Sequence, residues 1–155
     1  MGVPTSITSE EYRALAELRH RIRLFVHEGD AKAHAAGLEP QQYLILLAIR
    51  GLPDGTEATI RVLAERMALK HHSVVELVDR LEQRGLVKRS RYRDDRRRVL
   101  VSLLPRGEKL LEEVARHRIS ELRTSGAALV SAIEALLQKN GRAVGGIDFR
   151  GRRRK

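Results

Sequence analysis

The sequence predicts a mainly α fold with a small β component (α+β), and three observations support this. Hydrophobic residues make up 42% of the 155 residues but aromatic residues only 3%, so the core must consist of aliphatic side chains and alanine. That composition suits helices. Most of the chain repeats its apolar residues every three or four positions, as amphipathic helices do. Only the stretch after Gly85 changes to the period of two that indicates β-strands.

The first helix is expected from about Ser9 into the thirties. Thr8 and Glu11 have the spacing of a capping box, in which each side chain satisfies a backbone N–H of the first turn. Gly29 can end or kink this helix, and Gly37 breaks it. The narrow apolar seam follows steps of three and four: Leu15, Leu18, Ile22 and Phe25.

A second helix is expected to begin near Pro40, because proline suits the first helical turn. Its residues 43–49 are apolar nearly all round, so we expect the helix to be buried. The turn-rich stretch 51–55 ends it.

Two short helices joined by a tight turn are expected next, after a minimal strand at 58–60. Residues 61–68 form the first helix, with Leu63, Ala64 and Met67 inward. Residues 71–84 form the second, which places Val74, Leu77, Val78 and Leu81 inward and ends at Gly85. This pattern is typical of a helix-turn-helix with an outward-facing recognition helix.

A β hairpin is expected directly after Gly85. Leu86 and Val87 open one strand, and residues 98–103 alternate in the other. The reversal at 91–97 is rich in arginine. A basic hairpin that follows a helix-turn-helix is a wing, so residues 39–104 are predicted to form a winged helix-turn-helix DNA-binding domain.

Helices are expected again from Pro105, interrupted at Gly126 and ended at Asn140. The apolar stripes of the N-terminal helix (residues 1–38) and of the C-terminal helices (105–140) need a partner, and a second copy of the chain would provide one. Both chain ends are therefore expected to form a helical dimerisation domain. Residues 141–155 are glycine-rich and basic and are expected to form a disordered tail.

The net charge of +10 is concentrated in two segments. Residues 84–98 carry eight basic and two acidic side chains, and residues 150–155 add five basic ones. Concentrated positive charge favours a polyanion such as nucleic acid, because phosphate contacts release condensed counterions; a merely solvated basic surface is the alternative. The sequence has no cysteine and no membrane-spanning or signal-like segment, so a soluble cytoplasmic protein is expected.

Several ordered motifs resemble the MarR family of multiple-antibiotic-resistance-type regulators. They are 63-LAERM-67, 78-VDRLE-82, 85-GLVKR-89, 95-DRR-97 and 101-VSL-103, followed by Gly107 at a helix start. The resemblance implies a triangular homodimer that binds a pseudo-palindromic operator, usually as a repressor, and that in many relatives is released by a small aromatic or anionic compound. Three departures stand out: Leu104 replaces a capping threonine, Glu76 is acidic on the recognition helix, and the redox-sensing cysteine is absent.

The candidate DNA-binding residues lie on the recognition helix and the wing. The helix contributes Lys70, His71, His72, Ser73, Val75, Glu76 and Arg80, and the wing contributes Arg93, Arg96, Arg97 and Arg98. An ordinary solvated face is the alternative for the helix, and an ion pair with Asp79 is the alternative for Arg80. Asp95 is expected to orient a wing arginine, because a carboxylate repels phosphate.

An effector pocket is the second candidate site, with core or dimer-interface packing as the alternative. Its candidate lining residues are Tyr12, His20, Phe25, Tyr43 and His117. No metal or cofactor is expected: His20, His27 and His34 lie about 10 Å apart along a helix, too far for one ion, and His117 with Glu121 gives only two ligands.

Two other classes of function were weighed against operator binding. A general basic nucleic-acid-binding or architectural protein would use the tail alone, although aromatic residues for stacking on single strands are scarce. Enzymatic motifs such as a glycine-rich phosphate loop, H-E-x-x-H and G-x-S-x-G are absent from the sequence, so an enzyme is not expected.

Overall fold

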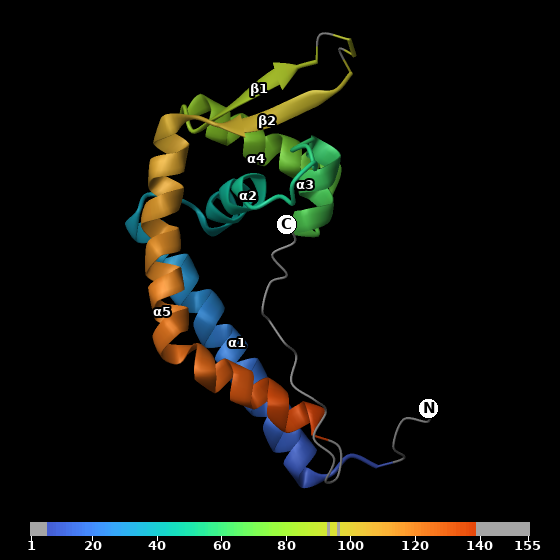
Figure 1. The fold of residues 1–155 in the computed structure, drawn as a ribbon, viewed down its shortest axis with the longest axis vertical. Helices are drawn as coiled ribbons and strands as arrows, with labels where there is room; N and C mark the ends of the chain where they lie inside the picture. Colours follow the sequence, from blue (N-terminus) through green and yellow to red (C-terminus); the bar gives the residue numbers. More distant parts are fainter. Residues whose placement is uncertain (1–5, 93, 96, 139–155) are drawn as a thin grey trace, which may run out of the picture. The chain divides into compact units, whose positions relative to one another are not determined.

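A computed structural model describes residues 6–92, 94–95 and 97–138 of the chain. Its elements follow the order α1 (Ser9–Ala35), α2 (Pro40–Arg50), α3 (Ile60–Met67), α4 (His71–Gln83), β1 (Val87–Arg91), β2 (Val99–Leu103) and α5 (Pro105–Leu137) (Figure 1). The expected mainly α fold with one hairpin is confirmed. Every helix in the described part of the chain is too short or too polar to cross a lipid bilayer.

The chain forms two compact units. One contains residues 26–121, and the other combines residues up to Phe25 with those from Leu122 onward. α1 and α5 each contribute to both units. The segment 39–104, expected to be the DNA-binding domain, lies within the first unit, where α2, α3, α4 and the hairpin pack on one another (Figure 1).

The core of the first unit consists of aliphatic side chains and Tyr43, and every element of the unit contributes to it. Leu46 of α2, Leu63 of α3, Leu81 of α4 and Val87 of β1 are fully buried. Burial of each such side chain contributes roughly 1.5–3 kcal/mol. The inward residues expected for both helices of the helix-turn-helix, with Met67 half-buried, belong to or pack against this core.

The helix-turn-helix is shaped by its caps. Thr59 caps α3 by accepting a hydrogen bond from the Val62 N–H at 3.2 Å. Ala68 then adopts the left-handed conformation (φ 51°) that turns the chain toward α4. Gly85 (φ 69°) follows the end of α4, as expected of a glycine that closes a helix.

The hairpin pairs β1 and β2 antiparallel, from Val87 opposite Leu103 to Arg91 opposite Val99. Val87 and Val101 face the core. The minimal strand expected at 58–60 is a single bridge between Thr59 and Leu100, supported by a 2.9 Å hydrogen bond from the Val101 N–H to the Ala58 carbonyl. This bridge ties the hairpin to the start of the helix-turn-helix.

Two expectations about the helices were wrong. α5 is one helix through Gly126, because a single glycine costs a helix only about 1 kcal/mol, which the neighbouring turns outweigh. α2 is apolar nearly all round but buries only one side, since Leu44 and Leu47 are 45% and 40% exposed. The outer side of α2 therefore lies at the surface of this unit.

The start of α5 packs directly against the chain between α4 and β1. The Leu104 N–H donates to the Leu86 carbonyl at 2.9 Å. Gly107, in the first turn of α5, comes so close to that carbonyl that a Cβ atom at Gly107 would lie 2.1 Å from the Leu86 oxygen. Only glycine permits this approach, which fixes where α5 leaves the hairpin.

Candidate nucleic-acid interface

The recognition helix α4 divides its residues between a buried and an exposed face. Val74, Leu77, Val78 and Leu81 are buried in the core. The predicted DNA-binding residues lie elsewhere on the helix: Lys70, His71, His72, Glu76 and Arg80 are exposed, and Ser73 and Val75 are half-buried. The interpretation of α4 as a helix with one free polar face therefore agrees with its geometry.

Three of these exposed residues, His72, Glu76 and Arg80, are four residues apart and form a row along α4, here called the outer row. Lys70 is the N-cap and makes no side-chain capping hydrogen bond, and of the first-turn N–H groups that of Ser73 donates to the Lys70 carbonyl at 3.1 Å. Such N–H groups and the positive helix end favour a phosphate oxygen. Arg80 pairs with no carboxylate among the described residues, although an ion pair with Asp79 was the alternative.

The chain reversal in the wing contains two hydrogen bonds between its own residues. The Arg98 N–H donates to the Asp95 carbonyl at 3.0 Å, and the Asp95 carboxylate accepts the Arg97 N–H at 3.0 Å. Asp95 was expected to orient a wing arginine; its carboxylate contacts the backbone N–H of Arg97, and the orienting role stays a prediction. Arg97 itself is exposed at the surface. Arg93 and Arg96 lie outside the described residues.

The base of the wing is held by a group of three side chains, here called the clasp. Arg98 Nη2 lies 2.6 Å from Glu57 Oε2, and its guanidinium sits 5.4 Å from the centre of the Tyr92 ring. The Tyr92 hydroxyl donates to the other Glu57 oxygen. This hydrogen bond and the charge of Glu57 raise the pKa of Tyr92. Arg98, predicted to contact phosphate, also pairs with Glu57 in the loop before α3, and its contact with phosphate stays a prediction.

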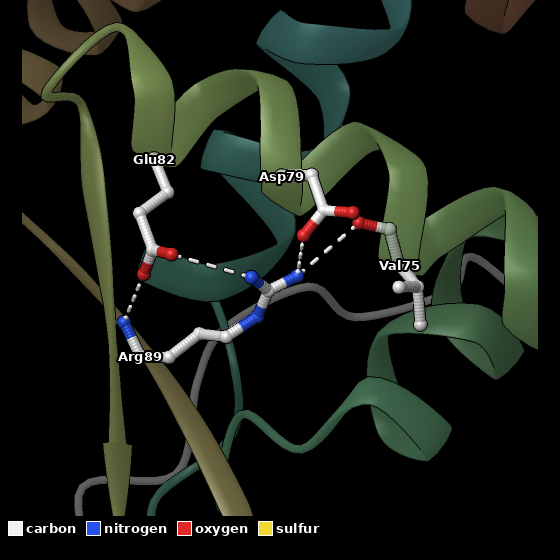
Figure 2. Close-up of polar contacts among 4 residues, drawn as sticks. All are labelled: Val75, Asp79, Glu82 and Arg89. Atoms are coloured by element: carbon white, nitrogen blue, oxygen red, sulfur yellow. Dashed lines mark hydrogen bonds and ion pairs between the residues drawn. The ribbon is translucent and has the colours of Figure 1, made fainter.

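A second connection, here called the brace, joins the wing to α4 through Arg89 of β1. Its guanidinium donates to the Asp79 carboxylate, to Glu82 Oε1 at 3.3 Å and to the Val75 carbonyl at 3.3 Å. The Arg89 backbone N–H donates to Glu82 Oε2 at 2.9 Å. Figure 2 shows the side chain extending along α4 with its fork between the two carboxylates. One arginine thus spans two turns of the recognition helix.

Sequence reasoning missed both connections. Arg89 was counted in the basic segment and in the motif 85-GLVKR-89 but was given no contact, and Glu57 was not considered. The spacing of Asp79 and Arg89 within the motifs 78-VDRLE-82 and 85-GLVKR-89 was the available signal. It could not be read as a contact without knowing that β1 folds back beside α4.

The candidate effector-pocket residues fall in both units. Tyr12, His20 and Phe25 belong to one unit, where Tyr12 is 60% exposed; Tyr43 and His117 belong to the other. Tyr43 is buried, which raises its pKa, while the charge of Arg118 acts in the opposite direction. His117 is exposed. The pocket stays a prediction.

The unit of residues 26–121 also contains a charged cluster that sequence reasoning did not find. Arg118 of α5 is only 6% exposed and pairs with Glu121. Its guanidinium lies against α1, since a Cβ atom at Gly29 would be 3.1 Å from Arg118 Cζ. A hydrogen bond with Glu28 raises the pKa of Glu121; burial adds to this, and Arg118 opposes it. The buried Arg118, its partner Glu121 and the neighbouring Glu28 therefore form one charged cluster.

A helix-turn-helix followed by a basic hairpin defines a winged-helix DNA-binding protein. The MarR family model matches residues 36–98. The organic hydroperoxide resistance transcriptional regulator of Bacillus subtilis (strain 168) is 30% identical over 109 residues, which cover 64% of this chain and 72% of that protein. The chain belongs to the MarR family. It is a DNA-binding transcriptional regulator and not an enzyme.

Solved structures agree with this assignment. AbsC, a MarR family regulator from Streptomyces coelicolor, has the same fold, with a TM-score of 0.69 at 22% identity over 86% of this chain and 93% of that one. CouR from Rhodococcus jostii RHA1, solved with p-coumaroyl-CoA bound, has a TM-score of 0.60 at 25% identity over 78% of this chain and 86% of that one.

Proposed function

We propose that this protein acts in the cytoplasm as a homodimer that binds a pseudo-palindromic operator in double-stranded DNA and represses transcription. Each protomer inserts the first turns and the outer row of α4 into the major groove, while its wing follows the phosphates toward the minor groove. The observation that carries the proposal is the division of α4 into a core-packed apolar face and an exposed polar face, followed by a basic hairpin tip.

Dimerisation is supported by apolar side chains that the unit built from the chain ends leaves at its surface. All of them lie in or next to α1 and α5 and are at least 37% exposed: Ile7, Tyr12, Leu15, Ile22, Leu24, Leu122, Val130, Ile133 and Leu137. A monomer rarely exposes so many apolar residues on two helices. A second copy supplies a matching surface, and its two-fold symmetry fits a palindrome.

Control by a small molecule is the last part of the proposal. CouR, a relative of this chain, was solved with a CoA thioester bound. For such a compound to release DNA, it must bind the DNA-incompetent conformation more tightly than the competent one. Operator titrations with and without each aromatic or anionic candidate test this, and unchanged affinity rejects the compound.

The test of operator binding is a titration of the dimer against the DNA upstream of its own gene and against a random duplex of equal length. We expect two chains per site, a preference for one palindrome of at least about 1,000-fold, and affinity that falls steeply with salt. Equal affinity for both duplexes at the same salt would refute the proposal. Deleting residues 150–155 should remove only part of the binding, whereas a general nucleic-acid binder would lose most of it.

The outer row provides a point variant for the same assay. Arg80→Ala should weaken operator binding roughly 10-fold or more while leaving the thermal unfolding midpoint unchanged, because Arg80 is exposed and packs no core. Lys32→Ala is the matched control, since Lys32 is an exposed cation near the end of α1, away from α4 in the sequence. Equal affinities for both variants would show that the outer row does not face DNA.

A further inference from the structure

The brace joins the two elements that the proposed function brings to DNA, and this inference rests on that proposed function. Arg89 lies in β1. The three groups that accept hydrogen bonds from its guanidinium all belong to α4: the Val75 carbonyl and the carboxylates of Asp79 and Glu82. These acceptors lie four and three residues apart and so form a row beside the outer row of His72, Glu76 and Arg80. The brace therefore lies directly beside the surface that meets the groove.

The brace also places a positive charge next to two carboxylates of the recognition helix. Asp79 and Glu82 are 49% and 41% exposed, and carboxylates on the recognition helix would repel phosphate. The Arg89 guanidinium, 26% exposed, contacts both. Arg89 Nη2 donates to Val75 and Asp79, and Nη1 donates to Glu82 (Figure 2). The single ammonium group of a lysine cannot reproduce this arrangement.

We propose that Arg89 is a positioning residue: it fixes the wing on the recognition helix and cancels the charge of Asp79 and Glu82, so that α4 and the wing meet one duplex as a single rigid reading surface. Arg89 does not contact phosphate in this role. Both terminal nitrogens of its guanidinium are engaged by α4, whereas Arg97 is an exposed wing arginine.

The experiment compares Arg89→Gln, Arg89→Lys and wild type in three measurements. The first is hydrogen exchange of the hairpin amides in the free protein, which needs no DNA. We expect exchange at 87–91 and 99–103 to accelerate at least about 10-fold in both variants, because either change breaks the fork. Lys88→Gln is the matched control, an exposed neighbour on the same strand outside the brace, and it should keep wild-type protection.

The second measurement is operator affinity as a function of salt. We expect both Arg89 variants to bind about 10-fold or more weakly with an unchanged salt slope, because no phosphate contact is lost. A residue that contacts phosphate would behave differently: its removal lowers the slope by about one, and lysine retains most of the binding.

The third measurement is rescue by charge removal. Adding Asp79→Asn and Glu82→Gln to Arg89→Gln should restore part of the lost affinity, since the freed carboxylates no longer repel DNA. The same two changes in the wild-type background should raise affinity less, because Arg89 already neutralises the carboxylates there; an equal gain in both backgrounds would indicate structural damage alone. Full rescue is not expected, because the wing stays unfixed.

The outcomes separate this inference from the proposed function. Unchanged hairpin exchange in both Arg89 variants would overturn the brace whatever the protein does with DNA. Wild-type affinity for Arg89→Lys, or a salt slope lowered by one, would overturn it in favour of a direct phosphate contact. Equal wild-type binding to operator and random duplex would refute operator recognition, and the exchange measurement would still decide whether Arg89 fixes the wing.

Discussion

Replacing Gly107 by alanine should lower the free energy of unfolding by about 3 kcal/mol, which corresponds to a fall in Tm of roughly 6–12 °C for a chain of this size. The new Cβ would lie 2.1 Å from the Leu86 carbonyl oxygen and 3.0 Å from its carbonyl carbon. Both are backbone atoms, so no side chain can rotate away. α5 must shift, and with it the hydrogen bond between Leu104 and Leu86.

The control for this prediction is Gly126→Ala, the same substitution farther along the same helix. There the new Cβ would meet only Leu122 carbon atoms at 3.9 Å, an ordinary contact. Alanine forms helices better than glycine by about 1 kcal/mol, so this variant should be stabilised. Opposite signs of the two changes, measured by thermal and denaturant unfolding, support the close contact. A Gly107→Ala protein as stable as wild type would show that α5 does not pack on Leu86 in solution.

Replacing Arg118 by methionine should destabilise the fold by roughly 3 kcal/mol at pH 7. Methionine fills much of the space but leaves Glu121 and Glu28 facing each other without a cation. Arg116→Met is the control, because Arg116 lies on the same helix and also pairs with a glutamate, but it is 76% exposed. An exposed pair of this kind contributes under about 1 kcal/mol.

Arg118→Met should destabilise the fold less at pH 5 than at pH 7. The pKa of Glu121 is raised in the folded chain, chiefly by its hydrogen bond with Glu28, so the native state retains a proton that the unfolded chain releases. Falling pH therefore favours the native state through this group. Because the charge of Arg118 lowers that pKa, the variant raises it further, and its stability loss should shrink from pH 7 toward pH 5.

Glu28→Gln added to Arg118→Met should recover part of the lost stability at pH 7, because it removes one of the two like charges. Unfolding curves at pH 5 and pH 7 measure this for the wild type, Arg116→Met, Arg118→Met and the double variant with Glu28→Gln. A loss of stability that is the same at both pH values and unaffected by Glu28→Gln would contradict the shared-charge account of the cluster.

The relation between sequence and structure differs along the chain. The elements from α2 to β2 could be predicted closely because their signals are local: Pro40 at a helix start, Gly85 at a helix end and the change of period after it. Gly126 misled the prediction of α5, since a local helix breaker competes there with a long apolar stripe that continues beyond it. The prediction that α2 is buried was wrong because periodicity shows that a helix face is apolar but not whether anything covers that face.

In the candidate interface, exposure along α4 could be predicted from the sequence, but contacts between distant residues could not. The outward residues of α4 follow from helical periodicity, so the exposed positions of Lys70, His72 and Arg80 could be predicted. Arg98 was predicted to contact DNA because it is a cation in a basic turn; that it also pairs with Glu57, 41 residues away in the sequence, could not be foreseen. A charge pattern shows where cations gather and not which of them are already paired.

The sequence by itself determined the class of this protein: the order of helices and strands, the buried and exposed faces of α4, the basic hairpin and the MarR motifs. These properties depend on neighbours within about four residues, where backbone geometry alone decides what can meet. Only the tertiary structure decided that Arg89 holds β1 on α4, that Arg98 holds the wing to Glu57, and that Gly107 lies on Leu86. Such contacts depend on the way distant segments fold back on one another, which local periodicity does not encode.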